Sequence, residues 1–191
     1  MIIETIFSTV NPEGHPNFAP MGVIWGEAVM TVRPFTSTTT YHNLAATGVG
    51  VANVTDNVLA FVRSALFDAP LAHFPAQNVP GVALEDACCW FELRVARIEN
   101  DASSRADVHC HVVGRGRQRD FVGFNRGKNA VIEATILATR LQLYTPAEIQ
   151  SALSHYREIV AKTGGDEERE AMACLEHYVE RWFLGSETST C

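Results

Sequence analysis

The sequence predicts a mainly β protein in which a compact antiparallel barrel, residues 1–124, precedes a helical C-terminal part, residues 125–191. Short alternating apolar runs separated by turn residues fill most of the first hundred residues. This part lacks the long helices between successive strands that a doubly wound parallel sheet needs. From about residue 125 onward, the apolar residues take the spacing of helices instead.

The predicted barrel begins with "ETIFSTV", which alternates up to the turn "NPEG", and continues with "NFAPMGVIWG" and "EAVMTVRPF". "TTTYHNLAATG" predicts a short helix with Thr40 as its N-cap and Gly48 at its end. "VGVANVT" predicts another strand, after which Asp56 is a candidate cap for a helix over "NVLAFVRSALF". Residues 68–86 contain three prolines and little periodicity, so we expect a long surface loop there.

Two further strands and three helices complete the prediction. "ACCWFELRVARIE" and "DVHCHVVGRG" are expected to pair antiparallel across the polar turn "NDASSRA". After the helical pattern "KNAVIEATILATRLQL", Thr145 and Glu148 form a capping-box pattern around Pro146, and Gly164 follows the end of that helix. The last helix, "DEEREAMACLEHYVERWFLG", has acidic residues in its first turn, where they complement the helix dipole.

Composition narrows the class of protein. Hydrophobic residues make up 47% and charged residues 19%, which favours a packed globular chain over disorder. The net charge of −7 argues against nucleic acid or an anionic membrane as the main partner. No apolar run is long enough to span a bilayer, and Glu4 near the start is atypical of a secretory signal. The five cysteines show neither repeated spacing nor a CxxC pair, so we expect reduced thiols and a cytoplasmic protein.

The stretch "RPFTSTTTYHNLAATG", residues 33–48, concentrates hydroxyl side chains between a predicted strand and a predicted helix. A phosphate group needs converging hydrogen-bond donors and a positive potential. Arg33, the hydroxyls of residues 36–40 and the helix-opening amides of Tyr41 to Asn43 would supply both. A solvated Ser/Thr loop is the alternative. Neither a P-loop nor a GxGxxG motif is present, so neither of those nucleotide sites is predicted.

Two other stretches of the predicted barrel have the chemistry of a binding site. Ala19, Pro20, Met21 and Gly22 offer a small apolar backbone surface suited to a flat ring, although a barrel corner would use the same residues. Asn53 is polar in an otherwise apolar strand, and it therefore needs either a backbone partner or a ligand.

A predicted apolar helix is preceded by Asn125, Arg126 and Lys128. These residues either cap the helix or contact an anion. His109 and His111 share a strand face, but no acid or third histidine follows at ligand spacing, so no metal site is predicted. No Ser/His/Asp order, nucleophile elbow, HExxH or paired-carboxylate pattern occurs, and we therefore name no catalytic residue. Any chemistry is expected to belong to a bound cofactor.

The segments "ETIFSTVNPEGHPNFAPMGV", "RPFTSTTTYHNL", "VGVANVTDN" and "FNRGKNAVIEATILATRL" together resemble the domain-of-unknown-function family 447 (DUF447). This is an FMN-binding split-barrel group related to the flavin reductases and pyridoxamine-phosphate oxidases. The resemblance covers nearly the whole chain in the same order. It implies a six-stranded split barrel, a homodimer, and FMN held near the subunit interface.

The resemblance also implies roles for individual residues. Those around the phosphate would be Arg33, Thr36, Ser37, Thr38, Thr40 and Asn43, while Ala19, Pro20, Met21 and Gly22 would line the isoalloxazine ring. Asn53 would steady the ribityl chain or the phosphate, and Thr9 would lie beside the ring site. Because the phosphate is a dianion in an acidic protein, we expect a second cation at the site. Asn125, Arg126 or Lys128 would provide this contact, with the neighbouring subunit as one source.

Three functions follow as alternatives. An enzyme would be an FMN-dependent oxidoreductase or flavin reductase that uses NADPH or NADH. A non-enzymatic flavoprotein would store or sense FMN, or carry electrons to a partner. A split barrel without flavin would act as an interaction module through its helices.

Overall fold

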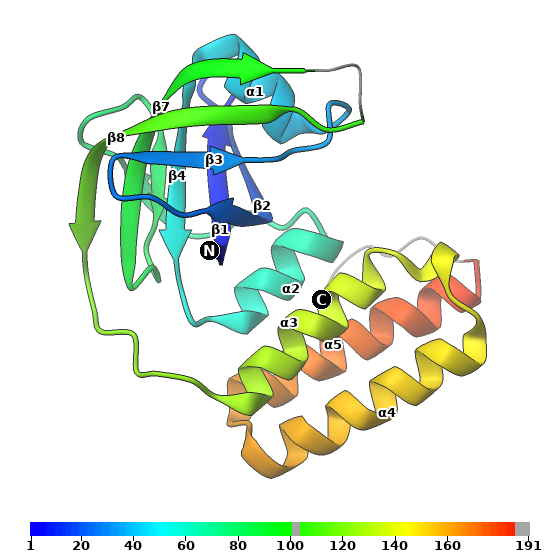
Figure 1. The fold of residues 1–191 in the computed structure, drawn as a ribbon. Helices are drawn as coiled ribbons and strands as arrows, with labels where there is room; N and C mark the ends of the chain where they lie inside the picture. The colour runs from blue at the N-terminus through cyan, green and yellow to red at the C-terminus, as the bar shows by residue number, and fades with distance from the viewer. Residues whose placement is uncertain (101–103, 186–191) are drawn as a thin grey trace. The chain divides into compact units, whose positions relative to one another are not determined.

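A computed structural model describes residues 1–100 and 104–185 of the chain (Figure 1). The predicted turn at residues 100–106 therefore falls partly outside the described residues, and Cys191 falls wholly outside them. The chain divides into two compact units. The first consists of Met1–Thr55 and Pro70–Phe121, and the second of Asp56–Ala69 together with the chain from Val122 onward.

The first unit is a closed antiparallel barrel of six strands in the order β1-β2-β3-β8-β7-β4. The bounds are β1 (Ile2–Val10), β2 (Pro16–Ile24), β3 (Val29–Val32), β4 (Val49–Val54), β7 (Cys89–Glu99) and β8 (Asp107–Arg117). The prediction of a mainly β barrel is thus confirmed, and so is the pairing of the two long strands, β7 and β8.

Alternation along the strands builds the barrel core. On β3 the side chains of Met30 and Val32 are fully buried, whereas Val29 points outward and is 43% exposed. Met30 and Val32 join a cluster that includes Phe7, Leu93 and Val108 from three other strands. Burial of each such side chain contributes about 1.5–3 kcal/mol, so the alternating pattern fixes which face of each strand turns inward.

Helix α1 (Thr39–Thr47) forms the second half of the stretch that concentrates hydroxyl side chains, residues 33–48. Thr38 is its N-cap and accepts a hydrogen bond from the amide of Tyr41. The prediction that Thr40 caps this helix is therefore wrong: Thr40 lies inside the first turn and is 2% exposed. Gly48 ends the helix with a φ of 70°, as predicted, because that backbone conformation suits glycine.

The segment expected to be a long surface loop contains a small sheet of β5 (His73–Pro75) and β6 (Val82–Leu84). Ala83 and Leu84 are buried, so the expectation of a surface loop is wrong for this part. The buried carboxylate of Glu92 on β7 holds the connection between the two strands, because it accepts hydrogen bonds from the amides of Gln77 and Asn78. Long-range contacts of this kind leave no periodic pattern in a sequence.

The second unit is helical: α2 (Val58–Leu66), α3 (Arg126–Ala138), the short 3-10 helix η1 (Leu141–Leu143), α4 (Pro146–Thr163) and α5 (Asp166–Phe183). Its core joins residues of α2, such as Val62, to Val131 of α3 and Leu175 of α5. The capping box of Thr145 and Glu148 is confirmed. The cap of α2 is Asn57, however, and not Asp56 as expected, since its side chain accepts the amide of Ala60 at 2.8 Å.

The described cysteines are not all alike. Cys88, Cys89 and Cys110 are free thiols, whereas Cys174 is disulfide-bonded, which corrects the expectation of reduced thiols at that position. Burial raises the pKa of the Cys110 thiol to about 12, so this side chain behaves as a core residue of the barrel. Within residues 1–100 and 104–185, no helix has both the length and the apolar character to cross a membrane.

Candidate functional site

Side-chain and main-chain hydrogen bonds stabilise the turn at residues 36–40, called the hydroxyl-rich turn below. The Thr38 hydroxyl donates to the carbonyl of Phe35 at 2.7 Å, and the amide of Thr38 donates to the same carbonyl at 3.0 Å. The amide of Thr36 donates to the carbonyl of Ser104 at 3.0 Å, which ties the turn to the residues before β8. The hydroxyls of Thr36 and Thr38 thus stabilise the turn, while Ser37 and Thr39 are exposed.

This turn offers donors to an anion. Among the described residues, the amide nitrogens of Ser37, Thr39 and Thr40 have no hydrogen-bond partner. They lie at or just before the first turn of α1, where the helix dipole adds positive potential. Neutral hydroxyls at Ser37 and Thr39 stand beside these amides. The donor set therefore fits a phosphate group better than it fits a cation or an apolar ligand.

Two guanidinium groups accompany the turn. Arg33 forms a bidentate pair with Asp107, with Nε–Oδ1 at 2.9 Å and Nη2–Oδ2 at 3.0 Å. Arg105 places its guanidinium carbon 4.0 Å from the ring centroid of Phe35. Sequence analysis identified Arg33 but missed Arg105, because the antiparallel pairing of β3 with β8, continued beyond Val32 and Val108, brings residue 105 opposite residue 35.

A buried polar cluster anchors α1 to the barrel. Asn43 on the helix donates to the Thr9 hydroxyl of β1 at 3.1 Å, and Asn17 of β2 donates to the Thr40 hydroxyl at 3.1 Å. Asn17 also reaches Thr9 at 3.5 Å, so these four residues form one hydrogen-bonded group. The structure thus brings the predicted residues Thr9, Thr40 and Asn43 together. Sequence analysis missed Asn17, although its position opposite Thr9 across the "NPEG" turn is a usable signal.

The four residues expected beside a flat ring lie in the middle of β2. Pro20 and Met21 pair with Ile6 and Thr5 of β1, and the Thr5 hydroxyl donates to the Met21 carbonyl at 3.0 Å. Ala19, Pro20, Met21 and Gly22 are all half-buried. Strand β2 therefore carries these residues together with Asn17, the residue that contacts Thr40.

Asn53 is fully buried, and its side chain is engaged by the barrel itself. Its amide nitrogen lies 2.9 Å from the carbonyl oxygen of Ile6 and 3.1 Å from the hydroxyl of Ser8, and its carbonyl accepts the amide of Leu84 at 3.0 Å. These contacts connect β4 to β1 and β6. Of the two interpretations open from the sequence, they favour a backbone partner, and a role toward a ligand stays a prediction.

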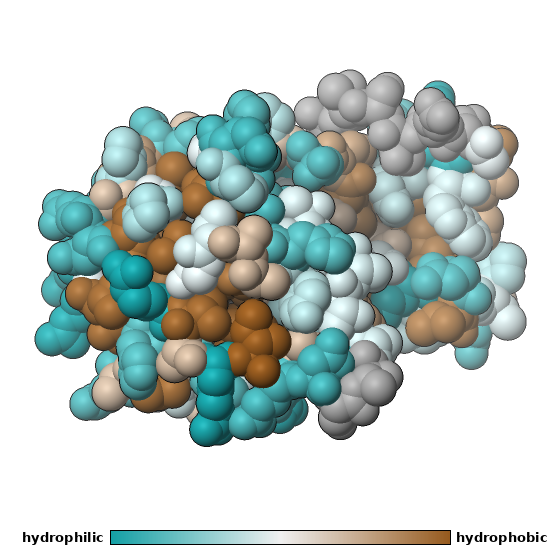
Figure 2. Space-filling model, turned by 90° about the horizontal axis from the view of Figure 1, so that it is seen from above, coloured by the Kyte–Doolittle hydropathy of each residue, from teal (hydrophilic) through white to brown (hydrophobic). Residues whose placement is uncertain are grey.

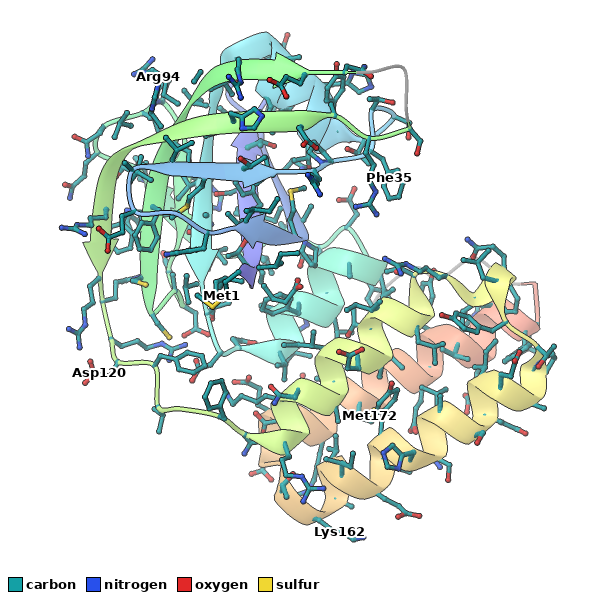
Figure 3. All side chains as sticks on the ribbon, viewed as in Figure 1. Met1, Phe35, Arg94, Asp120, Lys162 and Met172 are labelled. Carbon is teal, nitrogen blue, oxygen red and sulfur yellow. The ribbon has the colours of Figure 1, made fainter. Side chains whose placement is uncertain are left out.

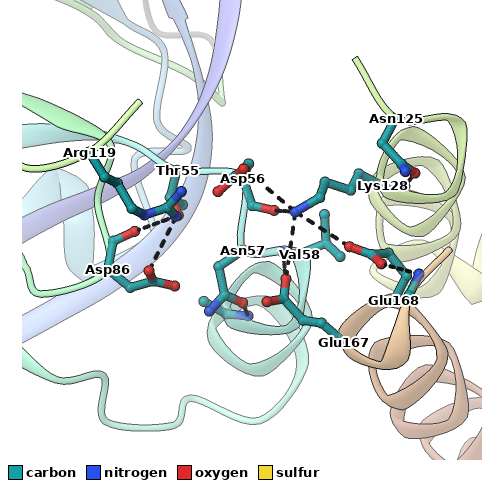
Figure 4. Close-up of polar contacts among 12 residues, drawn as sticks. Thr55, Asp56, Asn57, Val58, Asp86, Arg119, Asn125, Lys128, Glu167 and Glu168 are labelled. Carbon is teal, nitrogen blue, oxygen red and sulfur yellow. Dashed lines mark hydrogen bonds and ion pairs between the residues drawn. The ribbon is translucent and has the colours of Figure 1, made fainter. Parts of the chain in front are cut away.

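Asn125, Arg126 and Lys128 belong to the helical unit (Figure 4). Asn125 caps α3 by accepting the amide of Lys128 at 3.1 Å. The ammonium group of Lys128 donates to the carbonyl of Asp56 at 2.6 Å and lies 3.4 Å from a carboxylate oxygen of Glu168. Lys128 therefore neutralises carboxylates within its own unit, and its contribution to an anion site stays a prediction.

The remaining titratable groups do not converge. Among the described residues, no three His, Cys, Asp or Glu side chains are placed to hold a metal ion. His109 contacts the hydroxyl of Thr31 at 3.0 Å and lies 3.4 Å from Glu99.

Burial opposes ionisation of Glu92, but hydrogen bonds from the amides of Gln77 and Asn78 and from the side chains of Trp90 and Asn78 lower its pKa below the usual value.

Comparison with known families gives a match over most of the chain. Residues 3–119 match the family described as "Protein of unknown function (DUF447) N-terminal domain". Residues 125–177 match the family described as "Protein of unknown function (DUF447)".

Several solved structures are similar. An FMN-bound DUF447 protein from Methanosarcina mazei is 28% identical, with a TM-score of 0.80 over 93% of this chain and 94% of that chain. The 2-nitrobenzoate 2-nitroreductase of Pseudomonas fluorescens is 19% identical, with a TM-score of 0.53 over 60% of this chain and 64% of its own. A split-barrel protein from Shewanella frigidimarina, to which flavin reductase activity has been attributed, is 15% identical, with a TM-score of 0.54 over 63% and 69%. The last two similarities concern the fold alone, and the predicted split barrel is confirmed.

Proposed function

Because the chain belongs to the DUF447 family, we propose that it is a flavoprotein that binds FMN at the turn before α1. One observation carries this proposal. The amides of Ser37, Thr39 and Thr40, which have no hydrogen-bond partner within the described part of the chain, form a phosphate-compatible donor set, and a family member from Methanosarcina mazei is FMN-bound. The sequence contains no second Gly-rich loop for an adenylate moiety, which favours FMN over FAD.

Different residues of the barrel unit would bind different parts of the cofactor. The turn and Arg33 would bind the phosphate, and Ala19 to Gly22 on β2 would lie along the isoalloxazine ring. The side chains of Thr9, Thr40 and Asn43 would act indirectly, because they are buried and belong to one hydrogen-bonded group with Asn17. FMN, when bound, supplies the capacity to accept and donate electrons; the protein positions it.

We propose an FMN-dependent oxidoreductase or flavin reductase as the activity, with NADPH or NADH as the electron donor. The reductase named among the similar structures supports this activity only through a shared fold. FMN storage or electron transfer to a partner protein is the second candidate. The redox chemistry of either function would reside in the flavin, so both require the same binding site.

Two measurements separate these functions. Mass spectrometry of the chromophore released from purified protein should give FMN, and a predominance of FAD or the absence of any flavin would contradict the proposal. Under anaerobic conditions, addition of NADPH or NADH to the flavin-loaded protein should then reduce the flavin and bleach its absorbance. Bleaching by dithionite but by neither nicotinamide would favour the storage or electron-transfer function.

We also propose that the protein is a homodimer. Exposed apolar side chains occur in the barrel unit, among them Ile2 at 62%, Val29 at 43% and Val113 at 39% exposure. Figure 2 shows that apolar side chains gather on the face in view. Association of two copies would cover part of this surface. Analytical ultracentrifugation at micromolar concentration should show a dimer, and a flavin-bound monomer would contradict the proposal.

A further inference from the structure

Arg33 and Asp107 lie opposite each other directly before the hydroxyl-rich turn. The antiparallel pairing of β3 with β8 continues beyond β3 as an isolated bridge between Phe35 and Arg105. This register makes Arg33 and Asp107 cross-strand neighbours, three positions before Thr36, where the turn begins. The charges of both side chains therefore belong to the surroundings of the turn.

The two side chains form a bidentate ion pair. Nε of Arg33 lies 2.9 Å from Oδ1 of Asp107, and Nη2 of Arg33 lies 3.0 Å from Oδ2. These contacts occupy one of the edges with which a guanidinium group can bind a carboxylate or a phosphate through two parallel hydrogen bonds. A phosphate can use this edge of Arg33 only by displacing Asp107.

The pair brings no net positive charge to the turn, because the formal charges of Arg33 and Asp107 cancel. Glu99 lies opposite Asp107 on β7, but it has its own partners. Its carboxylate contacts Nε of Arg97 at 3.0 Å and Nε2 of His109 at 3.4 Å. The negative charge that Arg33 balances is therefore that of Asp107.

The fold does not depend on this ion pair. The side chain of the arginine is 54% exposed and that of the aspartate is 34% exposed, and ion pairs at this exposure contribute little to the free energy of unfolding. Main-chain hydrogen bonds hold the two segments together instead: the amide of Ala106 donates to the carbonyl of Pro34 at 3.1 Å, and that of Thr36 donates to the carbonyl of Ser104 at 3.0 Å. Replacing Asp107 therefore changes the charge beside the turn and leaves its backbone in place.

We infer that Asp107 weakens phosphate binding at the hydroxyl-rich turn and thereby speeds the exchange of FMN. This inference rests on the proposed function, in which the turn and Arg33 bind the phosphate. A phosphate dianion at the turn meets a guanidinium group that Asp107 already engages, and the carboxylate itself repels the dianion. Faster exchange suits a flavin reductase that releases reduced FMN to another reaction, and it does not suit a protein that retains its flavin permanently.

Substitution of Asp107 by asparagine tests the inference, since asparagine keeps the size of the side chain but carries no charge. Flavin fluorescence quenching at fixed ionic strength would give dissociation constants for FMN and for riboflavin, which lacks the phosphate. We expect D107N to bind FMN about 5- to 20-fold more tightly and riboflavin with unchanged affinity. Stopped-flow dilution of the loaded protein should show slower release of FMN by D107N than by wild type.

Asp120 provides the matched control. It is an exposed aspartate of the barrel unit that also pairs with an arginine, Arg117, and Figure 3 shows it well separated from Phe35. D120N removes the same charge and should leave both affinities unchanged. In an R33M background, D107N should tighten FMN binding by a smaller factor than in wild type, because no guanidinium group is left to release.

Three results would overturn the inference: unchanged or weaker FMN binding by D107N, an equal gain in riboflavin affinity, or an equal gain in D120N. The same gain from D107N with and without Arg33 would overturn the competition for the guanidinium group. Failure of both wild type and D107N to bind FMN would instead overturn the proposed function.

Discussion

Replacing Thr40 by valine removes one hydroxyl from the buried polar cluster and keeps the shape of the side chain. Thr40 is 2% exposed, and its hydroxyl accepts the only hydrogen bond shorter than 3.5 Å that the Asn17 amide nitrogen makes among the described residues. The variant leaves Asn17 with the weaker contact to Thr9 at 3.5 Å. Loss of a partner for a part-buried amide costs about 1–2 kcal/mol of unfolding free energy.

A double-mutant cycle with Asn17→Ala measures this interaction. Urea unfolding of wild type, T40V, N17A and the double variant should give a coupling energy of about 0.5–1.5 kcal/mol. T40S should stay near wild type because it keeps the hydroxyl. T39V is the matched control, since Thr39 is exposed on the same turn and its replacement should change stability by less than about 0.5 kcal/mol.

The cycle also separates two roles for Thr40. If the hydroxyl positions α1, then T40V weakens FMN binding in step with its loss of stability, and T40S restores both. A coupling energy near zero, or equal destabilisation by T39V, would refute the positioning argument. Loss of FMN affinity without loss of stability would instead make Thr40 a direct ligand, as the family resemblance implies.

Further predictions concern charge. Glu92→Gln should destabilise the protein by about 1.5–3 kcal/mol at neutral pH, because the carboxylate accepts the amides of Gln77 and Asn78. The pKa of Glu92 is lowered by folding, so its stabilisation is complete above the usual value of 4.5 and is lost as the pH falls through the lowered pKa. Thermal unfolding between pH 3 and 7 should therefore show wild type and E92Q converging at low pH, and a constant gap would contradict this. Arg33→Ala should weaken FMN binding and spare riboflavin binding in a flavin fluorescence titration at fixed ionic strength, and equal affinities for wild type and R33A would exclude it from the site. Charge reversal at Arg126 and Lys128 should weaken FMN more than reversal at Arg115 and Arg117; the opposite order in a salt-controlled titration would rule out the contact from α3.

The sequence predicted the barrel because its strands alternate and its turns contain glycine, proline and asparagine. The caps of α1 and α2 were each misplaced, by two residues and by one. Any of the three consecutive threonines at positions 38–40 can cap a helix, and the choice of Thr38 depends on the hydrogen bond that Asn17 donates to Thr40 from the barrel. Propensity alone does not contain that information.

The candidate site likewise contains residues that the sequence predicted and residues that it did not. The hydroxyl-rich turn was recognisable because its donors are adjacent in sequence. Arg105 was not, because its place opposite Phe35 depends on the pairing of β3 with β8, in which Val32 lies opposite Val108. The pairing of two strands that are far apart in the chain cannot be read from the alternation within either strand.

The helical unit is assembled from two separate stretches of chain. Lys128 at the start of α3 contacts Asp56, 72 residues earlier, and α2 contributes Val58, Leu59 and Val62 to the core shared with α3, α4 and α5. A fragment starting at Val122 would therefore expose the surface that α2 covers and leave Lys128 without Asp56. Such a fragment is expected to be poorly soluble. A fusion that links α2 directly to the C-terminal helices is the better starting point for studying this unit in isolation.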